Sequence, residues 1–185
     1  EKVPFFIVSL IIGIATINIQ ADSAIGDLEN HNFIERIAFA SYGFVMYVVK
    51  VFLPFQLSAL HPYPSVTNGL PALYMLMPLL ALAILGLVFW SKKYTKVAIF
   101  GFLFFIINVV LVLQFVSVGM AIMAERYTYV PYIGLFFALA YGVYYLLNNE
   151  TKLKIPRNAI FAALGLYVAI LCLLSFDRTK VWQNT

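Results

Sequence analysis

Six stretches of mostly apolar residues, separated by short polar segments, constrain the fold of this chain more than any other feature. A helix needs roughly 20 mostly apolar residues to cross the hydrocarbon core of a bilayer. The stretches cover residues 3–19, 37–57, 71–90, 97–116, 130–147 and 159–176. The sequence therefore predicts an all-α fold, a polytopic membrane helix bundle with about six transmembrane helices.

Composition agrees with one transmembrane domain over residues 1–185. Hydrophobic residues make up 63% of the chain and charged residues 11%, and the mean hydropathy is +0.93. These values lie far from those of soluble proteins and leave no separate soluble domain. The first stretch has no small-x-small cleavage site, so we interpret it as an ordinary span rather than a signal peptide, in a segment of a longer chain.

The basic residues of the short loops predict the orientation of the helices. Short loops that carry Lys and Arg are retained in the cytoplasm. The compact basic turns contain Lys92, Lys93, Lys96, Lys152 and Lys154. Both chain ends, the His61 loop and the Arg126 loop are therefore expected to face the periplasm or lumen.

Polar and small residues inside the apolar stretches predict helix packing. Asn18, Asn108 and Gln114 are expected to form hydrogen bonds between helices. Small residues spaced four apart predict close-packed helix faces. These pairs are Ser9 with Gly13, Ala138 with Gly142, and Gly165 with Ala169.

The sequence shows no cofactor motif and no metal-binding pattern. Cys172 is the single cysteine and lies in the last apolar stretch, so the chain forms no disulfide of its own. The sequence pI of about 9.1 comes from basic residues spread over membrane-proximal turns. This distribution predicts membrane lipids as partners and excludes nucleic acid.

Lys50 and His61 are candidate site residues that each have two interpretations. Lys50 lies near the end of an apolar stretch, where its amine can extend to the lipid headgroups, and we favour this over an inward orientation toward an anionic ligand. Pro62 and Pro64 hold the backbone around His61 extended. His61 is either an interfacial residue, which we favour, or a hydrogen-bonding partner of a sugar or phosphate.

The segment from Ser117 to Tyr129 differs from the other loops, because opposite charges and aromatic residues precede the fifth apolar stretch. Glu125 and Arg126 are adjacent, so each can meet a separate partner. The guanidinium of Arg126 suits bidentate binding of phosphate. Tyr127 and Tyr129 suit either sugar stacking or an aromatic belt at the membrane surface.

The stretch 125–134 resembles the signature of the transmembrane O-mannosyltransferases that carry tetratricopeptide repeats, members of the GT-C glycosyltransferase superfamily. The positions that match are Ala124, Glu125, Arg126, Tyr129, Pro131 and Gly134. Val130 and Tyr132 stand where the family has leucine and serine, which points to a bacterial relative. The aromatic-rich stretch with its Tyr63-Pro64 loop and the tail 178–182 are also similar to that family.

This resemblance implies a glycosyltransferase that moves a sugar from a polyprenyl-phosphate carrier to an acceptor such as a protein. It implies that the catalytic acid lies upstream of this segment, and that a soluble repeat domain follows residue 185. Asp22, Asp27, Glu29 and Glu35 do not replace that acid, since the predicted orientation places them in the cytoplasm. The segment would be inactive alone, with no catalytic residue, and would contact lipid phosphate through Lys50, His61, Glu125, Arg126, Tyr127 and Tyr129.

A membrane scaffold or a transporter segment is the alternative function. Transport predicts charged residues or broken helices at mid-membrane, and the apolar stretches contain few of either. The flanking sequence discriminates between these functions. An outward acidic loop upstream and 34-residue helical repeats downstream would favour the glycosyltransferase.

Overall fold

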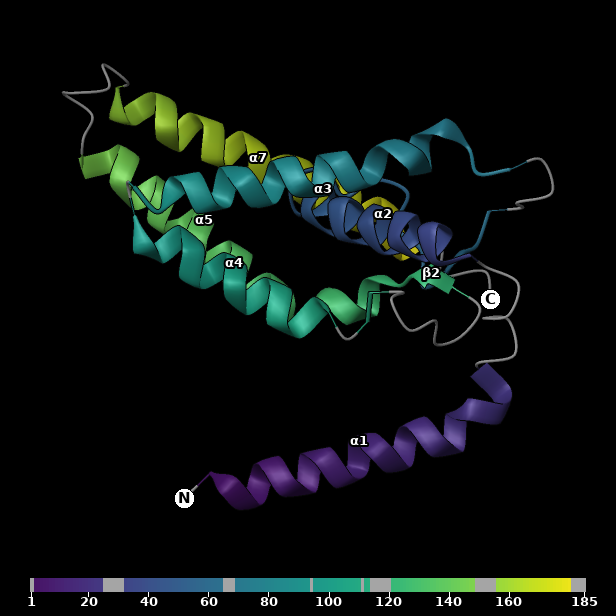
Figure 1. Ribbon diagram of the computed structural model, residues 1–185. Helices are drawn as coiled ribbons and strands as arrows, with labels where there is room; N and C mark the ends of the chain where they lie inside the picture. Colours follow the sequence, from purple (N-terminus) through teal and green to yellow (C-terminus); the bar gives the residue numbers. More distant parts are fainter. Residues whose placement is uncertain are drawn as a thin grey trace.

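The computed structural model describes residues 2–24, 32–64, 69–93, 95–110, 112–113, 121–148 and 156–180. This part of the chain is helical apart from its loops and one two-stranded ribbon (Figure 1). The helices are α1 (Val3–Ala24), α2 (Phe33–Phe52), α3 (Ala72–Ser91), α4 (Lys96–Val109), α5 (Pro131–Asn148) and α7 (Arg157–Lys180), with the 3₁₀ helix η2 (Glu125–Thr128). The strands are β1 (His61–Pro62) and β2 (Ala121–Met123). The predicted all-α class is confirmed.

Three of the described helices are long and apolar enough to cross a membrane, namely α3, α5 and α7. This supports a membrane protein, whereas six spans are not established. Helix α2 has 20 residues but carries Glu35, Arg36 and Lys50. Helix α4 has 14 residues, about 21 Å at 1.5 Å per residue, which is shorter than a hydrocarbon core of about 30 Å. In α1, the apolar part Val3–Ala15 is likewise short.

Two predicted spans end earlier than expected. Helix α2 stops at Phe52 instead of residue 57. The next residue, Leu53, precedes Pro54, and a residue before proline is driven out of the α conformation. Helix α4 stops at Val109 instead of residue 116, and part of the predicted remainder lies outside the described residues. Apolar composition alone did not predict where α2 and α4 end.

Helices α2 and α3 run in the same direction. Near their beginnings, the ring of Phe39 lies 5.8 Å from that of Tyr74. Near their ends, Val51 and Val88 line a common cavity. Figure 1 agrees, since both helices begin at the end of the bundle that holds β2. Six alternating crossings would make consecutive helices antiparallel, so the predicted alternation does not hold for α2 and α3. The prediction that Glu35 and the His61 loop lie on opposite sides of the membrane rested on this alternation and loses its basis.

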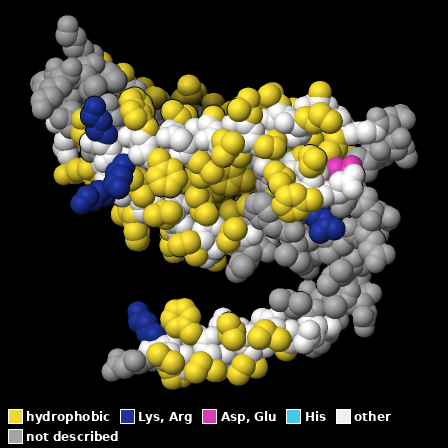
Figure 2. Space-filling model, in the orientation of Figure 1, with side chains coloured by type: hydrophobic (Ala, Val, Ile, Leu, Met, Phe, Trp, Pro, Cys, Tyr) yellow, Lys and Arg dark blue, Asp and Glu magenta, His cyan; other side chains and the backbone are white. Residues whose placement is uncertain are grey.

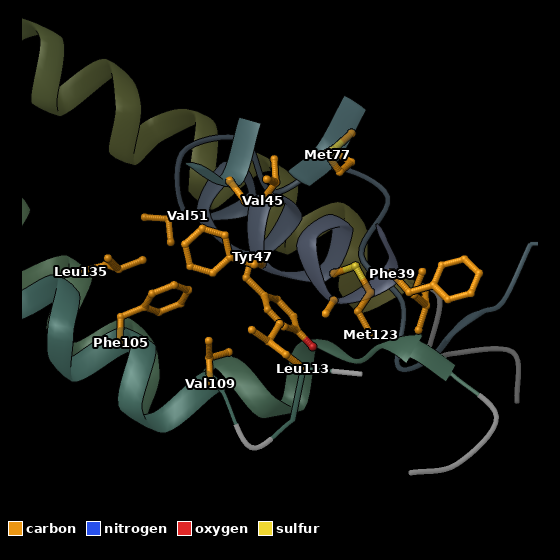
Figure 3. Packing of buried hydrophobic residues seen from close by; sticks show 14 of the residues in the cluster. Phe39, Val45, Tyr47, Val51, Met77, Phe105, Val109, Leu113, Met123 and Leu135 are labelled. Atoms are coloured by element: carbon orange, nitrogen blue, oxygen red, sulfur yellow. The ribbon is translucent and has the colours of Figure 1, made fainter. Parts of the chain in front are cut away.

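The hydrophobic core lies between α2, α3, α4 and α5 (Figure 3). Its largest fully buried side chains are Phe39, Tyr47, Phe105, Val109 and Met123. Two of them come from α2, two from α4 and one from β2. Outside this core, hydrophobic side chains cover the visible flank of the helices (Figure 2). An apolar surface of this kind suits contact with lipid chains.

Helices α4 and α5 approach each other most closely at Gly101 and Gly134. A Cβ atom at either glycine would lie 2.3 Å from the carbonyl oxygen of the other. Neither glycine belongs to the predicted close-packed pairs, and the glycines of those pairs, Gly13, Gly142 and Gly165, have open space where a Cβ would stand. Ala138 of the predicted pairs does lie at this approach, with its Cβ 3.0 Å from a Cβ built at Gly101, whereas the prediction is wrong for the three glycines. The i, i+4 spacing identifies a small face but not which helix covers it.

The polar residues of the apolar stretches do not join helices as predicted. The Asn108 side chain donates to the Phe104 carbonyl in its own helix at 2.8 Å, so its predicted interhelical bond is wrong. Asn18 is exposed. Gln114 lies outside the described residues.

Candidate functional site

The β1–β2 ribbon brings the His61 loop against the segment that precedes η2. The strands are antiparallel, with His61 opposite Met123 and Pro62 opposite Ala121. Glu125 follows this strand by two residues, so the ribbon carries it to His61 across 64 positions of sequence. The two loops that we singled out from the sequence therefore form one site.

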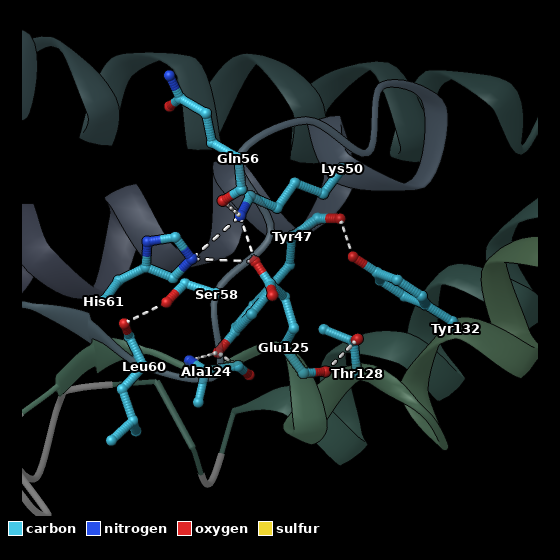
Figure 4. A network of polar contacts seen from close by, with 10 residues as sticks. All are labelled: Tyr47, Lys50, Gln56, Ser58, Leu60, His61, Ala124, Glu125, Thr128 and Tyr132. Atoms are coloured by element: carbon cyan, nitrogen blue, oxygen red, sulfur yellow. Dashed lines mark hydrogen bonds and ion pairs between the residues drawn. The ribbon is translucent and has the colours of Figure 1, made fainter. Parts of the chain in front are cut away.

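Lys50, His61 and Glu125 meet at one point between α2 and η2 (Figure 4). The Lys50 ammonium forms an ion pair with the Glu125 carboxylate. It also lies 3.1 Å from Nε2 of His61 and 3.3 Å from the carbonyl oxygen of Gln56. Lys50 is 4% exposed, so the favoured prediction that its amine reaches the lipid headgroups is wrong. A buried ammonium needs an anionic partner, and Glu125 supplies it.

His61 can bond to only one of its two charged neighbours at a time. Its Nε2 lies 3.1 Å from the Lys50 nitrogen and 3.0 Å from Oε1 of Glu125. An unprotonated Nε2 accepts from Lys50, whereas a protonated Nε2 donates to Glu125. The position of the imidazole proton therefore decides which contact is a hydrogen bond. The sequence has no acidic residue close to His61 along the chain, and the fold brings Glu125 to it.

The Glu125 turn is held by hydrogen bonds from several elements. The Tyr47 hydroxyl donates to the Ala124 carbonyl at 3.2 Å and lies 3.1 Å from the Ala124 N–H, which donates to it. The Thr128 hydroxyl donates to the Glu125 carbonyl at 2.6 Å. Tyr132, which stands where the resembled family has serine, donates to the Tyr47 carbonyl at 2.8 Å. Helix α2 thus holds the backbone of this turn through Tyr47, and α5 is bonded to the same residue of α2.

Arg126 contacts a different residue from its neighbour Glu125, as predicted from their adjacent positions. Its guanidinium carbon lies 5.2 Å from the centre of the Tyr127 ring, and Nη2 donates to the Tyr127 hydroxyl at 3.3 Å. This hydrogen bond raises the pKa of Arg126, which therefore keeps its charge. Tyr129 is exposed. Pro131 begins α5, where its missing N–H leaves no helical hydrogen bond unmade.

A cavity of about 540 Å³ opens beside this network. Its charged lining residues are Lys50, Glu125, Arg126 and Arg178. Its remaining lining residues, many of them apolar, are Val51, Pro54, Leu57, Ala59, Thr128, Tyr129, Tyr132, Phe136 and Leu171. Three cations and one carboxylate leave an excess of positive charge next to an apolar wall. Such a cavity suits a ligand with an anionic head and an apolar chain.

Four of the six predicted site residues line this cavity or its edge, and two do not. Lys50, Glu125, Arg126 and Tyr129 line it. His61 lies within hydrogen-bonding distance of Lys50 and Glu125, and Tyr127 contacts Arg126. Arg178 in α7 was missed as a site residue. Its signal in the sequence is its position seven residues after Leu171, on the same face of a helix.

Among the described residues, no group of three or more His, Cys, Asp or Glu side chains is arranged to hold a metal ion. The chain is thus all-helical, with three described helices able to span a membrane and with a cationic cavity between α2, η2, α5 and α7. No family model, curated protein or solved structure matches the chain.

Proposed function

We propose that this chain is the C-terminal membrane part of a polyprenyl-phosphate-sugar-dependent glycosyltransferase, similar to the O-mannosyltransferases that the 125–134 stretch resembles. The observation that carries the proposal is the cavity that joins Arg126 to an apolar wall containing Phe136 and Leu171. A polyprenyl phosphate combines the same two features, an anionic phosphate and an apolar chain. The catalytic acid belongs to a part of the enzyme outside this segment.

Arg126 would act on the leaving group of the transfer reaction. Breaking the bond between the sugar and its carrier leaves negative charge on the carrier phosphate. A guanidinium presents planar donors to phosphate oxygens, and the low dielectric near a membrane strengthens this contact. Arg126 has an exposed side chain and is bonded only to Tyr127 among the described residues, which leaves donors for a ligand.

The membrane location that goes with this function is a bacterial inner membrane, with the cavity on the periplasmic side. The basic turn between α3 and α4, with Lys92, Lys93 and Lys96, lies at the end of the bundle away from β2 (Figure 1). Basic turns favour the cytoplasm. The donor would therefore enter from the outer leaflet, and a periplasmic protein would serve as acceptor.

Replacing Arg126 in the complete enzyme tests the proposal. Arg126→Ala should lower transfer from a labelled polyprenyl-phosphate sugar about 100-fold, since one such donor is worth roughly 3 kcal/mol in the transition state. Arg126→Lys should recover part of the rate, because it keeps the charge but loses the planar fork. Lys93→Ala is a matched control, as it removes an exposed cation at the other end.

Unchanged transfer in a folded Arg126→Ala variant would exclude this role for Arg126. A wild-type enzyme that transfers sugar from none of a panel of polyprenyl-phosphate donors would contradict the proposed function itself.

A further inference from the structure

One face of α7 turns toward the bundle, and Arg178 belongs to it. The residues of α7 that are buried or partly buried are Ile160, Leu164, Tyr167, Leu171 and Arg178, whereas the others are exposed. Their spacings of three, four and seven residues place them on one stripe of a helix. The Tyr167 hydroxyl donates to the Val51 carbonyl at 2.7 Å, which shows that the stripe faces α2.

Arg178 lines the cavity and has no counter-ion among the residues that the structure describes. No hydrogen bond or ion pair joins it to another residue in the described ranges, although the neighbouring Asp177 pairs with Lys180 at 2.6 Å. That pair is well exposed on the other faces of α7. Arg178 lies on the stripe of α7 that faces the bundle, and it lines the cavity. This position favours contact with a ligand in the cavity over contact with the lipid headgroups.

Lys50 is the third cation of the cavity, and its donors are already used. An ammonium has three N–H donors. Gln56, His61 and Glu125 offer three acceptors within hydrogen-bonding distance. A ligand that bound Lys50 would have to displace one of them. The Glu125 charge is also neutralised by this contact, so the cations that remain for a ligand are Arg126 and Arg178.

We infer that Arg178 is a second anion-binding residue of this cavity, and that Lys50 supports the site by holding Glu125 without contacting the ligand. The ligand carries a phosphate between Arg126 and Arg178, with its chain along Tyr132, Phe136 and Leu171. Two guanidinium groups contributed by η2 and α7 would enclose the phosphate from different elements. This inference rests on the proposed function for the lipid chain of the ligand, but its assignment of Arg178 can be tested separately.

The experiment measures binding of decaprenyl phosphate, decaprenol and inorganic phosphate to the complete protein in phosphatidylcholine nanodiscs. Wild type should bind decaprenyl phosphate at least ten-fold more tightly than decaprenol or inorganic phosphate. Arg178→Gln should weaken decaprenyl phosphate binding roughly ten-fold, since charge-assisted hydrogen bonds to phosphate are lost. It should leave decaprenol binding and the unfolding temperature unchanged, because Arg178 has no partner among the described residues. Lys180→Gln is the matched control, and its effect should stay within two-fold.

The outcomes separate the two proposals. Equal binding by Arg178→Gln and wild type, with weaker binding by Arg126→Gln, would overturn the inference and leave the proposed function standing. Equal binding of decaprenyl phosphate and decaprenol by wild type would overturn the proposed function. Tight binding of inorganic phosphate alone, weakened by Arg178→Gln, would support the anion site and overturn the lipid carrier.

Discussion

The ammonium of Lys50 pairs with the carboxylate of Glu125 across 75 positions of sequence, and this contact joins the end of α2 to η2. The lysine side chain is 2% exposed and the glutamate side chain 21%. Burial strengthens the attraction between the charges and makes either charge costly without the other. The pair therefore holds the turn that presents Arg126.

Removing one member of this pair should destabilise the protein. Lys50→Met should lower the free energy of unfolding by about 3 kcal/mol, because it leaves the Glu125 carboxylate without its cation in a largely buried position. The double variant Lys50→Met/Glu125→Gln should lose less than the sum of the single variants, since neither charge is then unpaired. Thermal and chemical unfolding in detergent micelles measures both quantities.

Lys180→Met provides the control for this cycle. Lys180 and its partner Asp177 are both exposed, with side-chain exposures of 58% and 74%, respectively. Exposed pairs contribute about 0–1 kcal/mol. Additive losses at Lys50 and Glu125 would show that the two residues act independently.

Tyr47→Phe should loosen the Glu125 turn without opening the core. The ring stays, but the buried Ala124 N–H loses the hydroxyl that accepts its hydrogen bond, whereas the Ala124 carbonyl keeps the bond from the Tyr127 N–H. Unsatisfied buried groups cost about 1–3 kcal/mol. Tyr144→Phe, which removes a hydroxyl from an exposed ring, should have little effect. Hydrogen exchange of the Ala124 amide and unfolding measurements test this, and equal stability of the two variants would contradict the structural role of the hydroxyl.

Gly134→Ala should push α4 and α5 apart. The new methyl group would meet the Gly101 carbonyl oxygen, which is backbone and can move only with its helix. Overpacking of this kind costs about 1–3 kcal/mol. Gly142→Ala lies in the same helix with open space around it, so it should be neutral or slightly stabilising through helix propensity. A Gly134→Ala protein as stable as Gly142→Ala would contradict the close approach of the two helices.

Cysteine labelling should reach Tyr129 and Lys93 from opposite sides of the membrane. Both residues are exposed. Tyr129 directly precedes α5 and Lys93 follows α3, and the start of α5 and the end of α3 lie at different ends of the bundle (Figure 1). The Cys172→Ser background removes the native thiol. We expect Tyr129→Cys in intact cells to react with a membrane-impermeant maleimide, and Lys93→Cys to react only after permeabilisation. Labelling of Tyr129→Cys only after permeabilisation would overturn the proposed orientation.

Local patterns in the sequence determined the helical class, the membrane character and the residues around which the site forms. Runs of apolar residues predict helices because a backbone in lipid must satisfy its own hydrogen bonds. The start of α5 at Pro131 follows from the missing N–H of proline. Glu125 and Arg126 stood out because adjacent opposite charges and aromatic residues directly precede an apolar stretch.

The tertiary structure alone decided which of these residues meet. The contact of Lys50 with Glu125, the parallel course of α2 and α3, and the entry of Arg178 into the cavity all depend on how distant segments pack. Helical periodicity gives the face of a helix but not its neighbour, so the close approach at Gly101 and Gly134 was missed. The sequence likewise does not identify the counter-ion of a charged residue. Lys50 is buried because the fold brings Glu125 to it from a distant loop.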